Sequence, residues 1–394
     1  MLSKYITKII KDVETKGDKA LSYYTAKYDK VKLSPKGFRV PKTLIKASGK
    51  QLSPELRLSI EKAAKNIRSF HLKELSVSRK TWFADINGIK TGQIYNAVES
   101  AGIYVPGGRF PYPSTVLMSA IPAKIAGVKK LIIVTPPKNA SPAVLYAACC
   151  AGVDEVYTLN GPAAIAAMAY GTKTVPKVDI IAGPGNAYIN EAKRQVIGKV
   201  GIDSLAGPSE VAIIADSTAW PGFVAADILA QLEHDPDAKA YFFTDSRNLL
   251  NKVSGILKVF AGQYNLGKQY RASFCSIGKA VTAVNAIAPE HLELEVKQPA
   301  LLAKKIKNAG AIFAGSYTPT AVGDYWAGPS HVLPTGGAAR FSGGISTATF
   351  MKKTSYIECS ADSMKRFGSD IERLASSEGL ENHRNSIAIR NRKG

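Results

Sequence analysis

Between residues 129 and 246, short apolar runs alternate with stretches of helical periodicity. The apolar runs lie at 129–137, 155–159, 177–186, 210–216 and 239–246, and helices are expected at 142–152, 163–171, 187–200 and 223–235. Consecutive parallel strands need such a crossover helix, because a tight turn cannot join them. The alternation therefore predicts an α/β fold with helices on the faces of parallel sheets. At 394 residues the chain is long for one core, so we expect two domains or more.

The N-terminus and the cysteines indicate the cellular compartment of the protein. Residues 1–21 are typical of an amphipathic helix that carries acids, without the apolar block or cleavage site of a signal peptide. No apolar run approaches the ~20 residues that span a bilayer. The four cysteines show no CxxC spacing, and Cys149 and Cys150 are adjacent in an apolar helix. We therefore expect a reduced, cytoplasmic protein with no membrane partner.

The charge is strongly positive, with 52 Lys and Arg against 31 Asp and Glu, a formal net charge of +21. Such a surplus can indicate a nucleic-acid partner. The basic residues are scattered along the chain, apart from the short tail "RNRKG" at 390–394, and do not form one stripe. This distribution favours a dispersed basic surface over a nucleic-acid interface.

Three Gly-rich turns, at 104–114, 182–188 and 206–210, follow or precede the expected strands. Ligands of open parallel sheets bind beyond the carboxyl ends of the strands, where we expect these turns to lie. Glycine lets a backbone approach a phosphate closely, but none of the turns is a GxGxxG motif. Judged from the glycines alone, tight structural turns are the simpler interpretation.

The chain has only five histidines, and each has a structural interpretation beside a functional one. His71 ends the helix expected at 53–71, where it would interact with the last carbonyl groups. His234 follows Gln231 by three residues near the end of a helix, so both side chains share a face. Such a pair can bind a metal ion, although most such pairs only form hydrogen bonds.

The remaining histidines stand near acids. Asp324 and His331 bracket the loop "GDYWAGPSH", and His383 follows Glu378 by five residues. No zinc-finger or HExxH spacing occurs, so spacing alone reveals no metal site, although distant segments could assemble one. In "APEHLELEV", Glu290 and His291 are either an acid/base pair or the polar edge of a strand. The residues alone favour the strand edge.

Nine ordered blocks nevertheless carry a strong resemblance to a known family. They are "GIYVPGG", "STVLM", "PAKIAG", "TVPKVDIIAGPGNAYINEAKRQV", "AGPSEV", "AQLEHDPD", "APEHLEL", "GDYWAGPSHVLPTGG" and "EGLENHRNSIAIR". They cover nearly the whole chain from about residue 4, in the family's order. The sequence thus resembles the histidinol dehydrogenases, zinc-dependent enzymes of the last two oxidations of histidine biosynthesis.

The resemblance implies two Rossmann-like domains with incomplete, mostly parallel sheets and a small C-terminal helical segment. Residues 1–103 and 209–344 would form the first domain, 104–208 an NAD-binding domain, and 345–394 a dimerisation segment. The implied zinc ligands are Gln231, His234, Asp324 and His383. The residues implied to bind the substrate, L-histidinol, are Ser209, Gln231, His234, His291, Asp324, His331, Glu378 and His383.

The resemblance also assigns the chemistry. His291 would take the hydroxyl proton as hydride leaves the alcohol, since an imidazole of pKa ~6.5 suits that role. Glu290 would activate the water that attacks the aldehyde before the second oxidation. Zinc would act as a template that orients the substrate.

The implied NAD contacts are Tyr104 and Asn186. Here the chain departs from the family, which commonly has a glutamine in "GGAQAIAA" where "NGPAAIAAM" places Ala163. The loss of one cofactor hydrogen bond, worth ~1 kcal/mol, predicts weaker NAD binding.

The family pattern further implies an obligate homodimer in which Glu378 and His383 act in the partner's site. This chain is shortened around 247–280, and it lacks the N-terminal extension of many relatives, a loss that is expected to thin the interface. Two other interpretations stay open: a related zinc/NAD dehydrogenase of another small alcohol or diol, and a basic nucleic-acid-binding homologue without activity.

Overall fold

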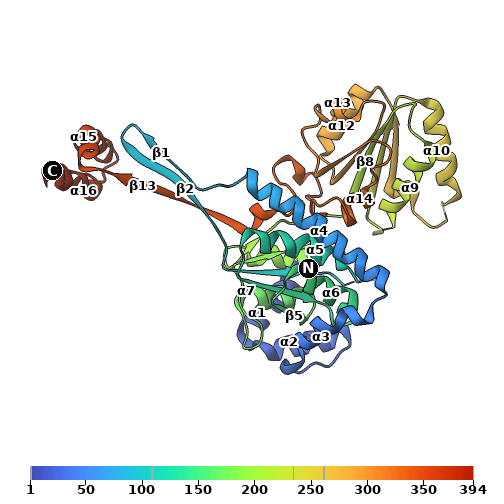
Figure 1. The fold of residues 1–394 in the computed structure, drawn as a ribbon, viewed down its shortest axis with the longest axis horizontal. Coiled ribbons are helices and arrows are strands. Elements are labelled where there is room, and N and C mark those ends of the chain that lie inside the picture. The colour runs from blue at the N-terminus through green and yellow to red at the C-terminus, as the bar shows by residue number, and fades with distance from the viewer. Residues whose placement is uncertain (1, 108–110, 234, 261, 394) are drawn as a thin grey trace. The chain divides into compact units, whose positions relative to one another are not determined.

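The computed structural model describes residues 2–107, 111–233, 235–260 and 262–393 (Figure 1). The chain divides into two compact units. Unit 1 comprises Met1–Leu75 and Val98–Phe350, and unit 2 comprises Ser76–Ala97 and Met351–Gly394. Each unit is described by itself below.

Unit 1 contains a five-stranded sheet of order β5-β4-β3-β6-β7, in which every pair is parallel. Its strands are β3 (Ser100–Tyr104), β4 (Lys130–Thr135), β5 (Glu155–Thr158), β6 (Ile180–Ala182) and β7 (Gly201–Ile202). The crossover helices are α5 (Pro113–Ala126), α6 (Pro142–Ala151), α7 (Gly161–Tyr170) and α8 (Ala187–Val196).

The N-terminal segment forms α1 (Leu2–Lys16) and α2 (Asp18–Tyr24), followed by α3 (Lys42–Ala47). The single helix expected at 1–21 is interrupted at Gly17, which adopts a φ of +54°. The apolar face of α1, with Ile6, Ile9 and Val13, is buried in one core with α7 and the sheet of β3. We had expected residues 1–103 to belong to one domain with residues 209–344. The apolar face of α1 packs instead with α7 and α8, which offer it an apolar surface.

A second five-stranded parallel sheet has the order β10-β9-β8-β11-β12. Its strands are β8 (Glu210–Ala215), β9 (Lys239–Thr244), β10 (Tyr270–Phe274), β11 (His291–Glu295) and β12 (Ala311–Ala314). The associated helices are α9 (Pro221–Leu232), α10 (Arg247–Val259), α11 (Leu266–Gln269), α12 (Ile277–Ile287), α13 (Pro299–Ala303) and α14 (Thr320–Tyr325). The predicted α/β class with two parallel sheets is confirmed.

The two faces of this second sheet bury alternate residues of each strand. Val211 and Ile213 of β8 pack with α9 and α10 on one face. Leu292 and Leu294 of β11 pack with α12 on the opposite face. The intervening residues of β11, which are His291, Glu293 and Glu295, therefore lie on the face that α9 covers. All five residues of β11 are buried, so the strand is not a polar edge.

Unit 2 is built from chain segments far apart in the sequence. Strands β1 (Trp82–Ile86), β2 (Ile89–Ala97) and β13 (Met351–Cys359) form an antiparallel sheet with β2 in the centre. The register of β2 and β13 pairs Ala97 with Met351 and Ile89 with Cys359. Helices α15 (Ala361–Ser377) and α16 (Glu381–Lys393) pack together as the expected C-terminal helical segment.

Helix α4 (Pro54–Val77) begins within one residue of the start of the helix expected at 53–71. It runs six residues past the expected end at His71. His71 is therefore not helix-terminal. It is fully buried, and its Nδ1 lies 3.0 Å from Glu74, whose carboxylate also accepts hydrogen bonds from the amide and hydroxyl of Thr347. Neither α4 nor any other helix in the described ranges combines the length and apolarity that crossing a membrane requires.

Candidate active site

The residues around Glu290 and His291 meet at the amino edge of the second sheet. Strand β11 begins at His291, opposite Val211 of the parallel strand β8, and Ser209 immediately precedes β8. Helix α9 follows β8 and returns toward the amino edge, which brings Gln231 of its last turn to the same place. The loop 206–210, expected after the carboxyl end of a strand, follows β7 and leads into β8, so Ser209 lies at the start of β8.

Glu290 is buried, with 7% of its surface exposed. The Ser209 hydroxyl donates a hydrogen bond of 2.5 Å to its Oε2, and the Glu210 amide donates to the same oxygen at 3.1 Å. Burial raises the pKa of Glu290 to about 8, although these two hydrogen bonds lower it. The carboxyl group is thus poised to exchange a proton near neutral pH.

Gln231 continues this hydrogen-bond chain. Its Nε2 donates to the Ser209 hydroxyl at 2.8 Å, and the residue is almost completely buried. An amide has one acceptor atom and one donor atom. With the nitrogen directed at Ser209, Oε1 is the atom that Gln231 can offer to a cation.

His291 lies between two carboxyl groups. Its Nδ1 is 3.7 Å from Glu290 Oε2, and its Nε2 is 3.8 Å from Asp324 Oδ1. The ring packs against Phe313, with ring centroids 5.7 Å apart. Burial raises the pKa of Asp324 to about 7. An imidazole in this position can pass a proton toward either carboxyl group.

Two contacts hold the side chain of His331 and define the tautomer of its ring. Its Nδ1 lies 3.0 Å from the backbone oxygen of Asp324. A carbonyl oxygen only accepts, so Nδ1 carries the hydrogen. In the neutral ring, Nε2 then accepts from the Thr115 hydroxyl, 3.2 Å away. Thr115 was not expected from the sequence, although it lies in the block "STVLM", because a hydroxyl in the first turn of a helix does not indicate its distant partner.

A glycine fixes the backbone at Glu290. The amides of Gly310 and Ala311 donate to the carbonyl groups of Pro289 and Glu290, both at 2.9 Å. A Cβ at position 310 would meet the Glu290 carbonyl oxygen at 2.5 Å, which is closer than real contacts. Only glycine therefore allows β12 to approach the acid/base pair this closely.

Of the eight residues expected to contact substrate or zinc, five lie in the described part of unit 1. Contacts between neighbouring residues form one continuous cluster, which contains Gln231, Ser209, Glu290, His291, Asp324 and His331. His234 is outside the described residues. Glu378, which directly follows α15, and His383 of α16 lie in unit 2, and both are exposed.

The chemistry of the cluster suits a divalent cation. Gln231 and Asp324 supply buried oxygen donors, and zinc accepts nitrogen and oxygen ligands in this way. Within the described residues, no lysine or arginine forms an ion pair with Asp324, and the His291 ring lies 3.8 Å from its Oδ1. A buried carboxylate in such surroundings is stabilised by a bound cation.

A separate cavity of about 720 Å³ lies at the first sheet of unit 1. Tyr104, Asn160 and Asn186 line it, together with the aromatic rings of Tyr5, Tyr28 and Tyr188. Its position follows the carboxyl ends of β3 and β6, where ligands of parallel sheets bind.

Hydrogen bonds order the polar groups of this cavity. The Tyr104 hydroxyl donates to Asn160 Oδ1 at 2.9 Å, and Asn160 Nδ2 donates to Asp29 at 2.7 Å. Asn186 caps α8 by accepting from two backbone amides, which leaves its Nδ2 as a donor. Ala163 is nearly buried in α7 and supplies no polar group. Asn160 was not expected from the sequence, because its partner Tyr104 is 56 residues away.

Comparison with known protein families gives a match over nearly the whole chain. The family model described as "Histidinol dehydrogenase" matches residues 1–391. A histidinol dehydrogenase of Thermosynechococcus vestitus is 46% identical over 396 residues, covering 97% of this chain and 91% of the relative. A histidinol dehydrogenase of Rhodospirillum rubrum is 44% identical, covering 99% of this chain and 92% of the relative.

Solved structures give the same result. The crystal structure of histidinol dehydrogenase from Elizabethkingia anophelis superposes with a TM-score of 0.92 and 37% identity, covering 100% of this chain and 93% of that one. An acetylating aldehyde dehydrogenase from Geobacillus thermoglucosidasius reaches a TM-score of 0.51 at 12% identity, covering 91% of this chain and 97% of that one. The latter similarity concerns the fold alone.

Proposed function

This chain belongs to the histidinol dehydrogenase family, and on that premise we propose that it oxidises L-histidinol through histidinal to L-histidine with two NAD. The observation that carries the proposal is the position of His291 between Glu290 and Asp324 in a buried cluster. Burial excludes water from the reacting groups and strengthens their electrostatic interactions.

In the first oxidation, His291 accepts the proton of the substrate hydroxyl while hydride leaves the same carbon. The neighbouring carboxyl groups stabilise the imidazolium that forms, at distances of 3.7 and 3.8 Å. Phe313 limits the tilt of the ring by packing against it. His291 is therefore the general base of this step.

In the second oxidation, Glu290 takes a proton from the water that attacks the aldehyde. A carboxyl group whose pKa is about 8 exchanges a proton readily near that pH, which suits this role. The hydrogen bonds from Ser209 and Glu210 hold one carboxyl oxygen in place. Both steps use one site, so the reactive aldehyde need not escape.

The residues that would hold zinc are Gln231, His234 and Asp324 of one chain and His383 of the partner subunit. Bound zinc would orient the substrate through its nitrogen atoms. Ser209 and His331 line the same cluster, and His331 is fixed by Thr115 and the Asp324 backbone. Glu378 would accept a charge-assisted hydrogen bond from the substrate's ammonium or imidazole group.

The NAD cofactor would occupy the cavity lined by Tyr104 and Asn186, with residues 104–208 as the cofactor-binding part of the chain. A volume of about 720 Å³ is in the range of sites for a ligand of this size. NAD supplies the hydride acceptor for both steps. The Asn160 side chain positions the Tyr104 hydroxyl for the cofactor.

A homodimer would complete the site. Glu378 and His383 are exposed in the single chain. His383 alone cannot hold a zinc ion, and the other ligands would come from the partner subunit. Unit 2 also exposes large apolar side chains that a partner could cover; they are Trp82, Phe83, Ile86, Ile357, Leu374, Leu380 and Ile389. Apolar surface of this extent on a small unit is typical of a protein interface.

Spectrophotometry of NAD reduction tests the proposal. Purified enzyme should form two NADH for each L-histidinol, a chelator should abolish the reaction, and added zinc should restore it. Small alcohols and diols without an imidazole serve as controls, since faster turnover of one of them would favour the related dehydrogenases. Absence of NAD reduction, combined with DNA binding that weakens steeply with salt, would instead support the nucleic-acid-binding homologue.

A further inference from the structure

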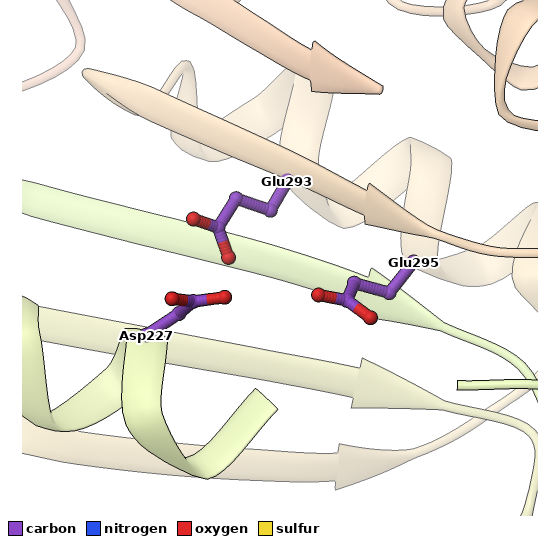
Figure 2. Close-up of side chains that lie close together, drawn as sticks. All are labelled: Asp227, Glu293 and Glu295. Carbon is purple, nitrogen blue, oxygen red and sulfur yellow. The ribbon is translucent and has the colours of Figure 1, made fainter. Parts of the chain in front are cut away.

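Three carboxyl groups gather between α9 and β11, beside the candidate active site. Asp227, Glu293 and Glu295 each place a carboxylate oxygen within 4.8 Å of the others, and Figure 2 shows the three groups directed at one another. Glu293 and Glu295 are 2% and 3% exposed. Asp227 is only half-buried, which leaves a route from solvent to the cluster.

The cluster lacks a compensating positive charge. In the part of the chain that the structure describes, the histidine of this region, His291, pairs with Glu290 and Asp324, and no basic side chain pairs with the three acids. The Thr320 amide donates to Glu293 Oε1 at 2.9 Å. The Oε2 atoms of Glu293 and Glu295 are buried and have no hydrogen-bond partner. An unpaired buried carboxylate oxygen is unfavourable unless a proton or a cation reaches it.

Burial raises the pKa of Asp227 to about 6 and that of Glu295 to about 7. Burial, reinforced by the charge of Asp227, also raises the pKa of Glu293 well above its ordinary value. A hydrogen bond joins Asp227 and Glu293, and near neutral pH the group of three carboxyl groups still retains negative charge. A shared proton joins only two oxygens, whereas one cation can contact all three carboxyl groups.

The donor atoms indicate the class of the cation. Ca²⁺ and Mg²⁺ both take carboxylate oxygens as ligands, and Ca²⁺ tolerates the more irregular arrangements of them. The three carboxylate oxygens lie close enough together for one ion to contact all of them. Three carboxyl groups without sulfur or imidazole are also the ligands that a hard cation prefers.

We propose that Asp227, Glu293 and Glu295 form a second cation site, separate from the proposed zinc ligands, that binds a hard divalent cation such as Ca²⁺. Asp227 stands one helical turn before Gln231 on α9, and Glu293 stands two residues after His291 on β11. A cation held by both elements would fix the helix and the strand that carry the candidate active site. The proposal does not depend on which alcohol the enzyme oxidises.

Calorimetric titration of full-length, zinc-loaded protein with calcium chloride tests this site, because the zinc already occupies its own ligands. We expect one equivalent per chain, with a dissociation constant on the order of 10⁻⁶ to 10⁻⁴ M. Asp227→Asn and Glu295→Gln should each weaken binding at least about tenfold, since each removes a charged ligand. Asp237→Asn is the matched control, because Asp237 is an exposed acid paired only with Lys268.

Thermal unfolding with and without calcium gives a second readout. Calcium should raise the melting temperature of the parent and of Asp237→Asn, and should leave that of the two site variants unchanged. The parent's own titration decides the question if a variant fails to fold. No saturable calcium binding by the parent up to ~10 mM, or equal binding by all four proteins, would overturn the proposal.

Discussion

The side-chain nitrogen of Gln231 lies 2.8 Å from the hydroxyl oxygen of Ser209, which in turn donates to the carboxyl group of Glu290. One hydroxyl therefore connects a proposed zinc ligand at the end of α9 with the proposed base that precedes β11. The connection sets the orientation of the Gln231 amide and lowers the pKa of Glu290 against the effect of burial.

Replacing Ser209 by alanine should disturb both ends of this connection. The hydrogen bond that lowers the pKa of Glu290 is lost, so that pKa rises and the pH at which activity reaches half its maximum moves up, by roughly one unit. We expect kcat/KM at pH 7 to fall about tenfold. A pH profile of NADH formation measures both effects. Ser59→Ala, at an exposed position of α4, is the control, and an unshifted profile for Ser209→Ala would refute the connection.

Replacing Glu290 by glutamine should separate the two oxidations. The first step relies on His291 and should continue, whereas the aldehyde step should slow by roughly 10²–10⁴-fold without its base. In the parent, the aldehyde step should rise with pH through about 8, because only the deprotonated carboxylate accepts a proton. Rates with histidinol and with histidinal, measured in single turnovers, distinguish the steps. Equal losses in both would mean that Glu290 does not act on water alone.

Restoring the family's glutamine at position 163 should tighten NAD binding. Ala163 is nearly buried in α7, next to cavity-lining Pro162, and a longer amide could reach the cavity. One recovered hydrogen bond of ~1 kcal/mol corresponds to a fivefold lower Michaelis constant for NAD, to order of magnitude. The Michaelis constant for histidinol serves as the control and should stay unchanged. No improvement for NAD would count against the assignment of this position.

Replacing Glu74 by glutamine should destabilise unit 1 in a pH-dependent way. Burial raises the pKa of Glu74, but the hydrogen bonds from His71 and Thr347 outweigh it, so the pKa is lowered overall. The stabilisation is thus complete above the ordinary pKa of 4.5 and is lost as the pH falls through the lowered value. At pH 7 we expect the free energy of unfolding to drop by about 1–3 kcal/mol.

Urea unfolding at pH 7 and near pH 3 measures this difference, which should shrink at the lower pH. Glu14→Gln, at an exposed position of α1, is the matched control. A loss of the same size at both pH values would show that shape rather than charge accounts for the role of Glu74.

Much of the fold could be predicted because local patterns specify it. The strand at 130–135 and the helix start at Pro54 follow from apolar periodicity and capping residues, which act over a few residues. The sheet against which α1 packs could not be predicted from its sequence, because the apolar face with Ile6 and Ile9 can pack against any apolar surface. Only the tertiary structure decides which sheet receives it.

The candidate site was predictable in part for a similar reason. Motif resemblance pointed to Glu290 and His291, although the alternation of acidic and apolar residues in 291–295 is typical of a half-exposed strand. The acids of β11 are buried because α9, which carries Asp227 more than 60 residues earlier, covers this face of the sheet. Thr115 and Asn160 likewise gain their roles from partners that no local pattern specifies.

The pairing of β2 with β13 has a consequence for synthesis on the ribosome. Residues 89–97 emerge roughly 250 residues before 351–359, a delay of about 13–50 s at ordinary elongation rates. A lone two-stranded hairpin is marginally stable at best. Strands β1 and β2 therefore lack their third strand, β13, during the time in which both parallel sheets can form. A chain released before residue 351 would keep Trp82 and Phe83 on an unpaired hairpin, where chaperones and proteases could recognise the aborted product.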